Sequence, residues 1–200
     1  MSKILWKCSD RKLKDSNLFK FENFLKKKYK INYQNSFVKL WEWSINYPGE
    51  FWKSIWQYFN IKGQLGNENK LIHFSKVFYK NKFLSNFKLN FTENLLIKND
   101  NSLAITFISE NGYKENKTWN DLKTDVTKIS GWLKSIGIKK NDRIAAYLPN
   151  YIETVEAFLA SASLGAIWSS CSPDFGTQGV IERFSQINPR VLFIADKYYY

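Results

Sequence analysis

The sequence is poor in the residues that most often carry catalysis, metal binding and crosslinking. Its 200 residues include one histidine, two cysteines and one methionine. Cys8 and Cys171 are far apart and form no CxxC spacing, which argues against a disulfide framework and a zinc site. His73 follows Leu-Ile and precedes Phe, a setting that favours a structural role over catalysis or metal binding. No Ser–His–Asp arrangement and no H-E-x-x-H metal site is present.

Long apolar runs are also missing. No stretch approaches the roughly 20 residues that a membrane-spanning helix needs. The N-terminus, MSKILWKCSDRKLK, is charged throughout and lacks the continuous apolar core of a signal peptide. The sequence therefore predicts a cytoplasmic protein with no membrane partner.

Arginine is scarce although the formal net charge is +12. Residues 1–100 hold 19 basic and 8 acidic side chains, whereas residues 101–200 hold 11 and 10, so the excess is almost all lysine in the first half. Nucleic-acid recognition favours the bidentate fork of arginine. We therefore interpret the charge as a solvated lysine-rich surface and expect no nucleic-acid partner. The arginines are Arg11, Arg143, Arg183 and Arg190.

Alanine is absent before Ala104, and this change in composition divides the chain. The polar run at 98–102 is typical of a linker, so we predict two parts, 1–98 and 99–200. The first is aromatic, basic and mostly helical, with helices near 17–28, 33–45 and 49–59 and Pro48 between the last two. Its aromatic face is expected to be core, or a surface docked on another domain. This face comprises Trp41, Phe51, Trp52, Trp56 and Phe59.

The second part alternates strands and helices. Strands are predicted at 103–109, 143–148, 166–170 and 191–195, and helices at 118–136, 153–164 and 177–187. Thr118 is a candidate cap for the first of these helices, and Gly137 ends it. The pattern predicts an α/β fold in which βαβ units form a parallel sheet covered by helices. The first helix should bury one stripe: Leu122, Val126, Ile129, Trp132, Leu133 and Ile136.

The segment that follows the strand at 166–170 is the candidate ligand site. Ligands of open parallel sheets bind outside the carboxyl ends of the strands. The N-terminus of the next helix, near Thr177, suits a phosphate group. An ordinary turn after a strand explains the same residues, and the sequence pattern alone leaves both interpretations open. The hydroxyl groups on offer are those of Ser169, Ser170, Ser172 and Thr177.

Five blocks of the sequence carry a resemblance to a known family. They read LGAIWSSCSPDFG at 164–176, VIERFSQINPRVLFIAD at 180–196, DRIAAYLPN at 142–150, LNFTENLL at 89–96 and WEWSINYPGEFW at 41–52. Together they resemble the acetoacetyl-CoA synthetases, a branch of the acyl-adenylate-forming ligases. The WSSCSPDFG run separates this branch from the acetyl- and propionyl-CoA synthetases, which remain the alternative. In that family these blocks form the opening third of a much longer enzyme.

The resemblance implies a fold and a reaction. It implies the N-terminal part of the large domain of an adenylate-forming ligase, incomplete here. An acetyl-CoA-synthetase-type helical segment would occupy 1–98, and a truncated AMP-binding domain would begin at 99. The parent enzyme would convert ATP, acetoacetate and CoA to acetoacetyl-CoA, AMP and diphosphate, with Mg²⁺ as the metal. Of its substrates, this chain would approach CoA.

The resemblance also implies the residues on the CoA side, which are Ser172, Pro173, Asp174 and Tyr200. Asp174 would repel CoA phosphates unless it faced the pantetheine arm, and a role as a helix cap competes with this one. In the LN-x-x-EN segment, Asn90, Glu93 and Asn94 are expected to tie the first part to the sheet by buried hydrogen bonds. Asn86 and Phe87 replace the glycines that usually precede this segment.

The family's catalytic loops are missing from these residues. The chain has no GxxxxGK[ST] and no Ser/Thr-Gly-Thr-Thr-Gly run, so we assign no catalytic residue and no metal ligand. We expect an N-terminal fragment that is inactive alone and binds no cofactor tightly. A truncated gene, a sequence fragment and one half of a split enzyme with a complementary downstream chain all remain open. The alternative is a non-catalytic module whose basic aromatic first part binds an acidic partner or an anionic membrane.

Overall fold

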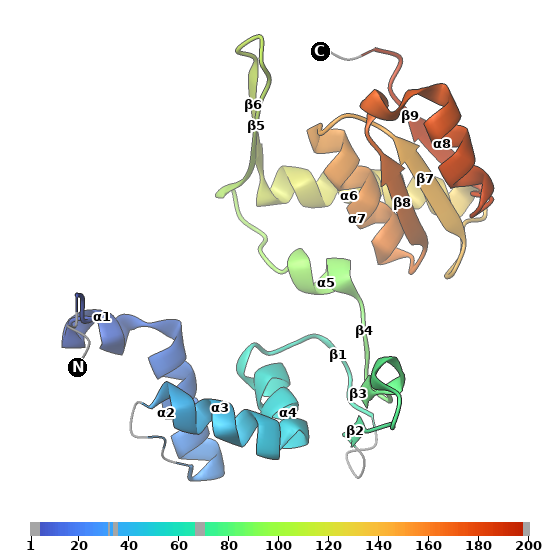
Figure 1. Cartoon of the computed structure of the whole chain (residues 1–200). Coiled ribbons are helices and arrows are strands. Elements are labelled where there is room, and N and C mark those ends of the chain that lie inside the picture. The colour runs from blue at the N-terminus through green and yellow to red at the C-terminus, as the bar shows by residue number, and fades with distance from the viewer. Residues whose placement is uncertain (1–4, 32, 34–35, 67–70, 198–200) are drawn as a thin grey trace. The chain divides into compact units, whose positions relative to one another are not determined.

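Figure 1 shows the computed structural model of the chain, which describes residues 5–31, 33, 36–66 and 71–197. The chain divides into two compact units, Met1–Lys88 and Leu89–Tyr200. None of the described helices is long and apolar enough to cross a membrane.

Four helices begin the first unit: α1 (Asp10–Asp15), α2 (Asn17–Tyr29), α3 (Phe37–Asn46) and α4 (Pro48–Tyr58). Serine caps the first three, because the side chains of Ser9, Ser16 and Ser36 each accept a hydrogen bond from a backbone N–H of the first turn. Pro48 is the first residue of α4, where its missing N–H costs nothing. The helices enclose a core of Phe21, Leu25, Tyr33 and Leu40.

One expectation for this unit needs correction, and another applies to only part of its residues. The helix predicted at 33–45 begins at Phe37, because Ser36 is its cap. The predicted aromatic face is split by the packing of the helices. Trp56 is buried and Phe51 packs against the core, whereas Trp41 and Phe59 are 51% and 59% exposed.

Short strands complete the first unit. β1 (Gly63–Gln64) pairs with β4 (Lys88–Leu89), the strand at the junction of the units. β2 (Ile72–His73) pairs antiparallel with β3 (Lys82–Phe83), and their connection contains the short 3₁₀ helix Phe78–Lys80. His73, expected to have a structural role, is an exposed residue of β2.

The second unit opens with α5 (Phe91–Leu95), followed by β5 (Leu103–Ile108), β6 (Lys114–Thr118) and α6 (Trp119–Ser135). β5 and β6 form an antiparallel hairpin that turns at Gly112, which has a φ of +84°. The strand expected at 103–109 therefore exists, but assigning it to the parallel sheet was wrong. Its partner β6, with the sequence KENKT, was missed because it has no apolar alternation. Thr118 caps α6 as predicted, in a capping box with Asp121.

A parallel sheet with the strand order β8–β7–β9 forms the centre of this unit (Figure 1). Its strands are β7 (Arg143–Tyr147), β8 (Ile167–Cys171) and β9 (Val191–Ile194), joined through α7 (Ile152–Ser163) and α8 (Gly176–Ser185). Neighbouring side chains of β7 point to opposite faces. Ile144 packs with residues of α6 and α7, and Ala145 packs with Val180 and Phe184 of α8, so helices cover both faces. The α/β fold with βαβ units is confirmed.

The buried stripe of α6 is narrower than predicted. Leu122, Val126 and Leu133 are almost fully buried, and Ile129 packs against the same core. Trp132 and Ile136 are 48% and 44% exposed, so their predicted burial was wrong. The ring of Trp132 still contacts Phe193 of β9, with 5.8 Å between centroids.

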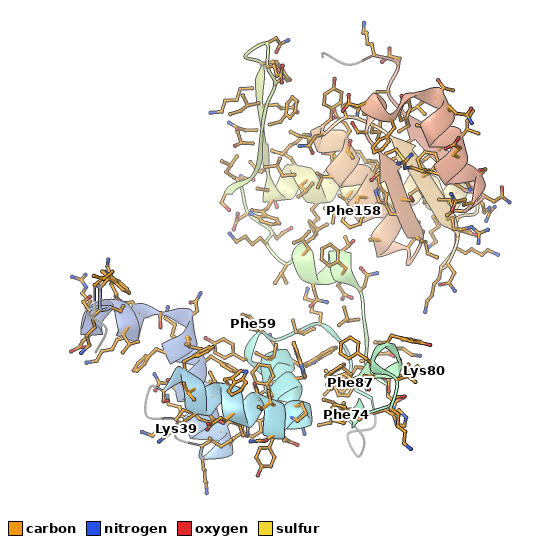
Figure 2. All side chains as sticks on the ribbon, in the orientation of Figure 1. Lys39, Phe59, Phe74, Lys80, Phe87 and Phe158 are labelled. Carbon is orange, nitrogen blue, oxygen red and sulfur yellow. The ribbon has the colours of Figure 1, made fainter. Side chains whose placement is uncertain are left out.

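The boundary between the two units lies at 88/89 in the sequence, ten residues before the predicted boundary at 98/99. Thr92 Oγ1 donates to the carbonyl of Leu159 at 2.8 Å, and Asn90 Nδ2 donates to the carbonyls of Ala162 and Ser163 at 2.9 and 3.2 Å. The ring of Phe91 lies 5.9 Å from that of Phe158, which Figure 2 labels on α7. These contacts make residues 89–97 part of the second unit.

Candidate functional site

A cleft of about 1240 Å³ opens at the carboxyl ends of β7 and β8. The cleft has three walls, and the first is the β5–β6 hairpin, from Thr106 to Glu115. The other two are the turn between β7 and α7 and the loop after β8. The connections after β7 and β8 lead to helices on opposite faces of the sheet, which is the setting where open α/β sheets bind ligands.

The loop after β8 brings three predicted residues to this cleft. Ser172, Pro173 and Asp174 all line it. Ser172 caps the 3₁₀ helix Pro173–Phe175, and its Oγ donates to Asp174 Oδ2 at 2.7 Å. The hydroxyl of Tyr147, the last residue of β7, donates to the carbonyl of Pro173 at 2.7 Å. The sheet itself therefore fixes the position of the loop.

Gly176 allows the chain to turn from this loop into α8. Its φ of +63° is a conformation that residues with a Cβ rarely adopt. The N-terminus of α8 has no side-chain cap, since the carboxylate of Asp174 is bonded to Ser172 instead. The competing role of Asp174 as the cap of this helix is therefore not what the geometry shows.

Aromatic rings join the hairpin to the turn after β7. Tyr151 packs edge-on against Phe107, with 5.6 Å between ring centroids, and Phe107 lies 6.3 Å from Tyr113. Thr154 Oγ1 donates to the carbonyl of Pro149 at 2.7 Å and holds the turn against α7. This wall offers a stacking surface beside the polar loop.

Among the residues that the structure describes, the charged side chains that line the cleft are all acidic: Glu110, Glu115, Glu153 and Asp174. Tyr113 donates its hydroxyl to Glu115 Oε2 at 3.0 Å. This hydrogen bond and the charge of Glu115 raise the pKa of the Tyr113 phenol, with a smaller contribution from Glu153. The cleft therefore repels polyphosphate and favours neutral or hydrogen-bond-donating groups.

A partly buried ionic cluster supports the hairpin from behind. Lys117 Nζ of β6 lies 2.6 Å from Asp125 Oδ2 of α6 and 3.3 Å from Glu156 Oε1 of α7. Burial raises the pKa of Glu156, and Lys117 opposes that effect. The pKa of Asp125 is lowered, chiefly by its hydrogen bond with Lys117. Lys128 reaches the same carboxylate at 3.0 Å.

The remaining candidates are placed differently. Ser169, Ser170 and Thr177 do not line the cleft. Tyr200 lies outside the described residues, so its predicted role is untested. Sequence reasoning missed the hairpin residues and Tyr151, which no local motif marks. Asn-Gly at the hairpin turn was the one available signal that a second strand follows.

The LN-x-x-EN segment holds α5 on α7, in part as predicted. Asn90 makes the long-range hydrogen bonds described above and also caps α5 through the N–H of Glu93. Asn94 donates to the carbonyl of Asn90 at 2.9 Å, and Glu93 is exposed. Thr92, which was not singled out, makes the buried bond to Leu159.

Metal ligands do not gather in this structure. Within residues 5–31, 33, 36–66 and 71–197, no three side chains of His, Cys, Asp or Glu are grouped as a metal site. Cys171 is a free thiol buried under α8, and Cys8 is a free thiol that is partly exposed. We therefore assign no Mg²⁺ ligand among the described residues.

Comparison with known proteins gives relatives across the whole chain. It is 40% identical over 159 residues to the acetoacetyl-coenzyme A synthetase of Rhizobium meliloti, covering 80% of this chain and 24% of the relative. It is 32% identical over 201 residues to the acetoacetyl-CoA synthetase of Xenopus tropicalis, covering 100% and 30%. The malonamoyl-CoA synthetase vrtB of Penicillium aethiopicum is 32% identical over 196 residues, covering 95% and 27%.

A solved structure agrees with these relatives. The acetoacetyl-CoA synthetase from Streptomyces lividans superposes with a TM-score of 0.89 at 26% identity, covering 100% of this chain and 31% of that one. The chain thus spans about a quarter to a third of the length of the proteins it matches. The family described as AMP-binding enzyme matches residues 98–199, which include the sheet and the loop after β8. The chain belongs to the AMP-binding enzyme family.

Proposed function

We propose that this chain provides the CoA-side part of an acetoacetate–CoA ligase. The reaction would convert ATP, acetoacetate and CoA to acetoacetyl-CoA, AMP and diphosphate through an acyl-adenylate. The names of the relatives support this substrate class, because acetoacetate and malonamate are both short carboxylates with a carbonyl group at carbon 3. Catalysis would depend on residues outside these 200, since this sequence contains no phosphate-binding loop of the family.

The observation that carries the proposal is the placement of Ser172, Pro173 and Asp174 at the carboxyl end of β8, in a cleft whose described lining includes no basic side chain. Phosphate groups would be repelled there, whereas the pantetheine arm of CoA is uncharged and carries two amide N–H donors. We propose that Asp174, oriented by Ser172, accepts a hydrogen bond from this arm. The CoA phosphates would lie outside the cleft, on the side predicted for Tyr200.

The ligase mechanism divides the work between two half-reactions. Acyl-adenylate formation would use ATP and acetoacetate, and the loop after β8 would take no part in it. In the second half-reaction the CoA thiol attacks the acyl carbon and AMP leaves. Asp174 and Ser172 would act there by orienting the pantetheine arm, which lowers the entropic cost of bringing the thiol to the acyl group. The aromatic wall formed by Phe107, Tyr113 and Tyr151 would exclude water from that path.

The test is a chimaera in which this chain replaces the matching part of the Rhizobium meliloti enzyme. The chimaera should form acetoacetyl-CoA. Asp174→Ala should leave acetoacetate-dependent ATP–diphosphate exchange nearly unchanged and raise the KM for CoA by on the order of tenfold, the value of one lost hydrogen bond to a charged group. Glu42→Ala, an exposed carboxylate on α3, is the matched control.

Two results would contradict the proposal. Equal losses in both half-reactions would make the loop a structural element without a role in CoA binding. A chimaera that is folded and carries out acetoacetate-dependent ATP–diphosphate exchange, but forms no acetoacetyl-CoA, would show that this chain does not supply a working CoA side.

A further inference from the structure

The β2–β3 hairpin carries two aromatic side chains that nothing in the proposed function uses. Phe78 and Tyr79 lie at its tip, residues 74–81, and are 89% and 80% exposed. Large aromatic side chains are seldom so exposed, because each one held in water forgoes the free energy of its burial. Figure 2 labels Phe74 and Lys80 at this hairpin.

Hydrogen bonds hold the hairpin tip in one conformation. The N–H of Ser75 donates to Asn81 Oδ1 at 2.7 Å, and the N–H of Val77 donates to Ser75 Oγ at 3.2 Å. The N–H groups of Lys80 and Asn81 donate to the carbonyls of Val77 and Phe78 and close the 3₁₀ turn. An ordered tip loses little conformational entropy when it binds a partner.

Ring contacts support the hairpin tip from below. The rings of Phe74 and Phe83 lie edge to face, with 6.5 Å between their centroids. Phe83 in turn contacts Trp52 of α4 at 6.4 Å. Phe78 and Tyr79 take part in no described ring pair, so they project from a supported base.

Lysines surround the projecting rings. Lys76, Lys80 and Lys82 are all exposed, and the sequence has no Asp or Glu from position 69 to position 92. In the part of the chain that the structure describes, none of the three forms an ion pair. Residues 1–88 hold 18 basic and 6 acidic side chains, so the rest of the unit adds to the positive potential.

We propose that the hairpin tip docks on an anionic lipid surface. Phe78 and Tyr79 enter the boundary between headgroups and acyl chains, and the three lysines contact the anionic headgroups while their aliphatic stems lie along the apolar layer. A lipid surface needs no groove of matching shape, which suits a tip that projects on a short turn. Arg11 is the one arginine of residues 1–88, and the tip has none, so the chemistry favours lipid over nucleic acid.

The expectation of no membrane partner rested on missing apolar runs. Such runs identify helices that span a bilayer, whereas peripheral binding through a few side chains leaves no such pattern. The exposure of Phe78 and Tyr79 is visible only in the structure.

The experiment measures partition of the full 200-residue chain onto vesicles made of equal parts of phosphatidylserine and phosphatidylcholine. Phosphatidylcholine vesicles give the baseline. The parent chain should bind the anionic vesicles, and added salt should weaken binding. Removing both rings with Phe78→Ala and Tyr79→Ala should lower the partition coefficient at least about tenfold. The triple change Lys76→Gln, Lys80→Gln and Lys82→Gln should lower it on the order of a hundredfold.

The matched control removes the same charge elsewhere in the unit, by Lys12→Gln, Lys14→Gln and Lys20→Gln on exposed positions of α1 and α2. Partition equal to that of the parent chain in the ring variant would overturn the proposal. So would an equal loss in the control, which would indicate diffuse charge attraction without a site. Binding of a single-stranded RNA, lost with the two rings and accompanied by no vesicle binding, would assign the tip to nucleic acid instead.

Discussion

Lys117 on β6 lies within ionic contact of Glu156 on α7, with 3.3 Å between Nζ and Oε1. Glu156 is only 4% exposed, and the charge of Lys117 opposes the effect of burial on this carboxylate. The contact connects the hairpin that forms one wall of the cleft to the helix that follows another wall. The cluster therefore holds two walls of the cleft in place, although its residues do not line the cleft.

Lys117→Met should destabilise the chain by about 3 kcal/mol, because it leaves the buried Glu156 carboxylate without its counter-charge. Urea denaturation followed by tryptophan fluorescence measures this loss. Combining Lys117→Met with Glu156→Leu should restore most of the stability, since no buried charge then lacks a partner. A double variant no more stable than Lys117→Met would contradict this account.

Asp125 predicts a dependence of stability on pH. Its pKa is lowered from the ordinary 3.8, first by the hydrogen bond from Lys117. A lowered pKa means that the stabilisation is fully present above the ordinary value and is lost as the pH falls through the lowered one. Asp125→Asn should be less stable than the parent by about 1 kcal/mol at neutral pH, with the difference closing in strong acid. Asp15→Asn, an exposed change on α1, is the matched control.

The chain alone should show no acetoacetate-dependent exchange of diphosphate into ATP, because these 200 residues contain no phosphate-binding loop of the family. The assay uses radiolabelled diphosphate, with the Rhizobium meliloti enzyme as the positive control. Exchange above the blank would show that other residues of this chain hold the triphosphate.

Thr92→Val should cost about 1 kcal/mol of stability, the usual value of one buried hydrogen bond. Thr92 is 3% exposed, and its hydroxyl donates to the carbonyl of Leu159 at 2.8 Å. Thr92→Ser keeps the hydroxyl and should therefore lose less stability than Thr92→Val. If urea denaturation ranks serine below valine, packing of the methyl group outweighs the hydrogen bond.

β9 should promote self-association of the chain. It is an edge of the described sheet, and Leu192 and Ile194 are 49% and 64% exposed. Unpaired apolar edges template strand pairing between chains. Ile194→Lys should reduce light scattering and binding of a hydrophobic dye, whereas Ile181→Lys on the exposed side of α8 should change association less. Similar effects from both changes would indicate general surface hydrophobicity.

Local patterns were sufficient to predict the longer helices and the parallel strands, whereas the short helices α1 and α5 were not predicted. The spacing of Leu122, Val126 and Leu133 identified α6, and Thr118 marked its start. The antiparallel pairing of β5 was missed although Asn111-Gly112 marks a tight turn, because Lys114–Thr118 is polar on both faces and does not show the pattern of a strand. Exposure of Trp132 was missed because helical spacing indicates a face and not what covers it.

The candidate site was predictable only where the family resemblance reaches it. Ser172, Pro173 and Asp174 follow a recognisable strand, so their place at its carboxyl end could be foreseen. The acidic lining brings Glu115 of the hairpin together with Glu153 of α7, and this depends on where the hairpin packs. No local pattern indicates such a long-range arrangement.

The hydrogen bonds from Asn90 and Thr92 to α7 have a consequence for exchanging parts between relatives. The family match begins at residue 98, whereas the second folding unit begins at Leu89. A crossover at residue 98 would give α7 a foreign α5, and the partners of its last carbonyl groups would then come from another lineage. A crossover ahead of Leu89 keeps Asn90 and Thr92 with the α7 that they contact, so hybrids joined there should be more stable than hybrids joined at residue 98.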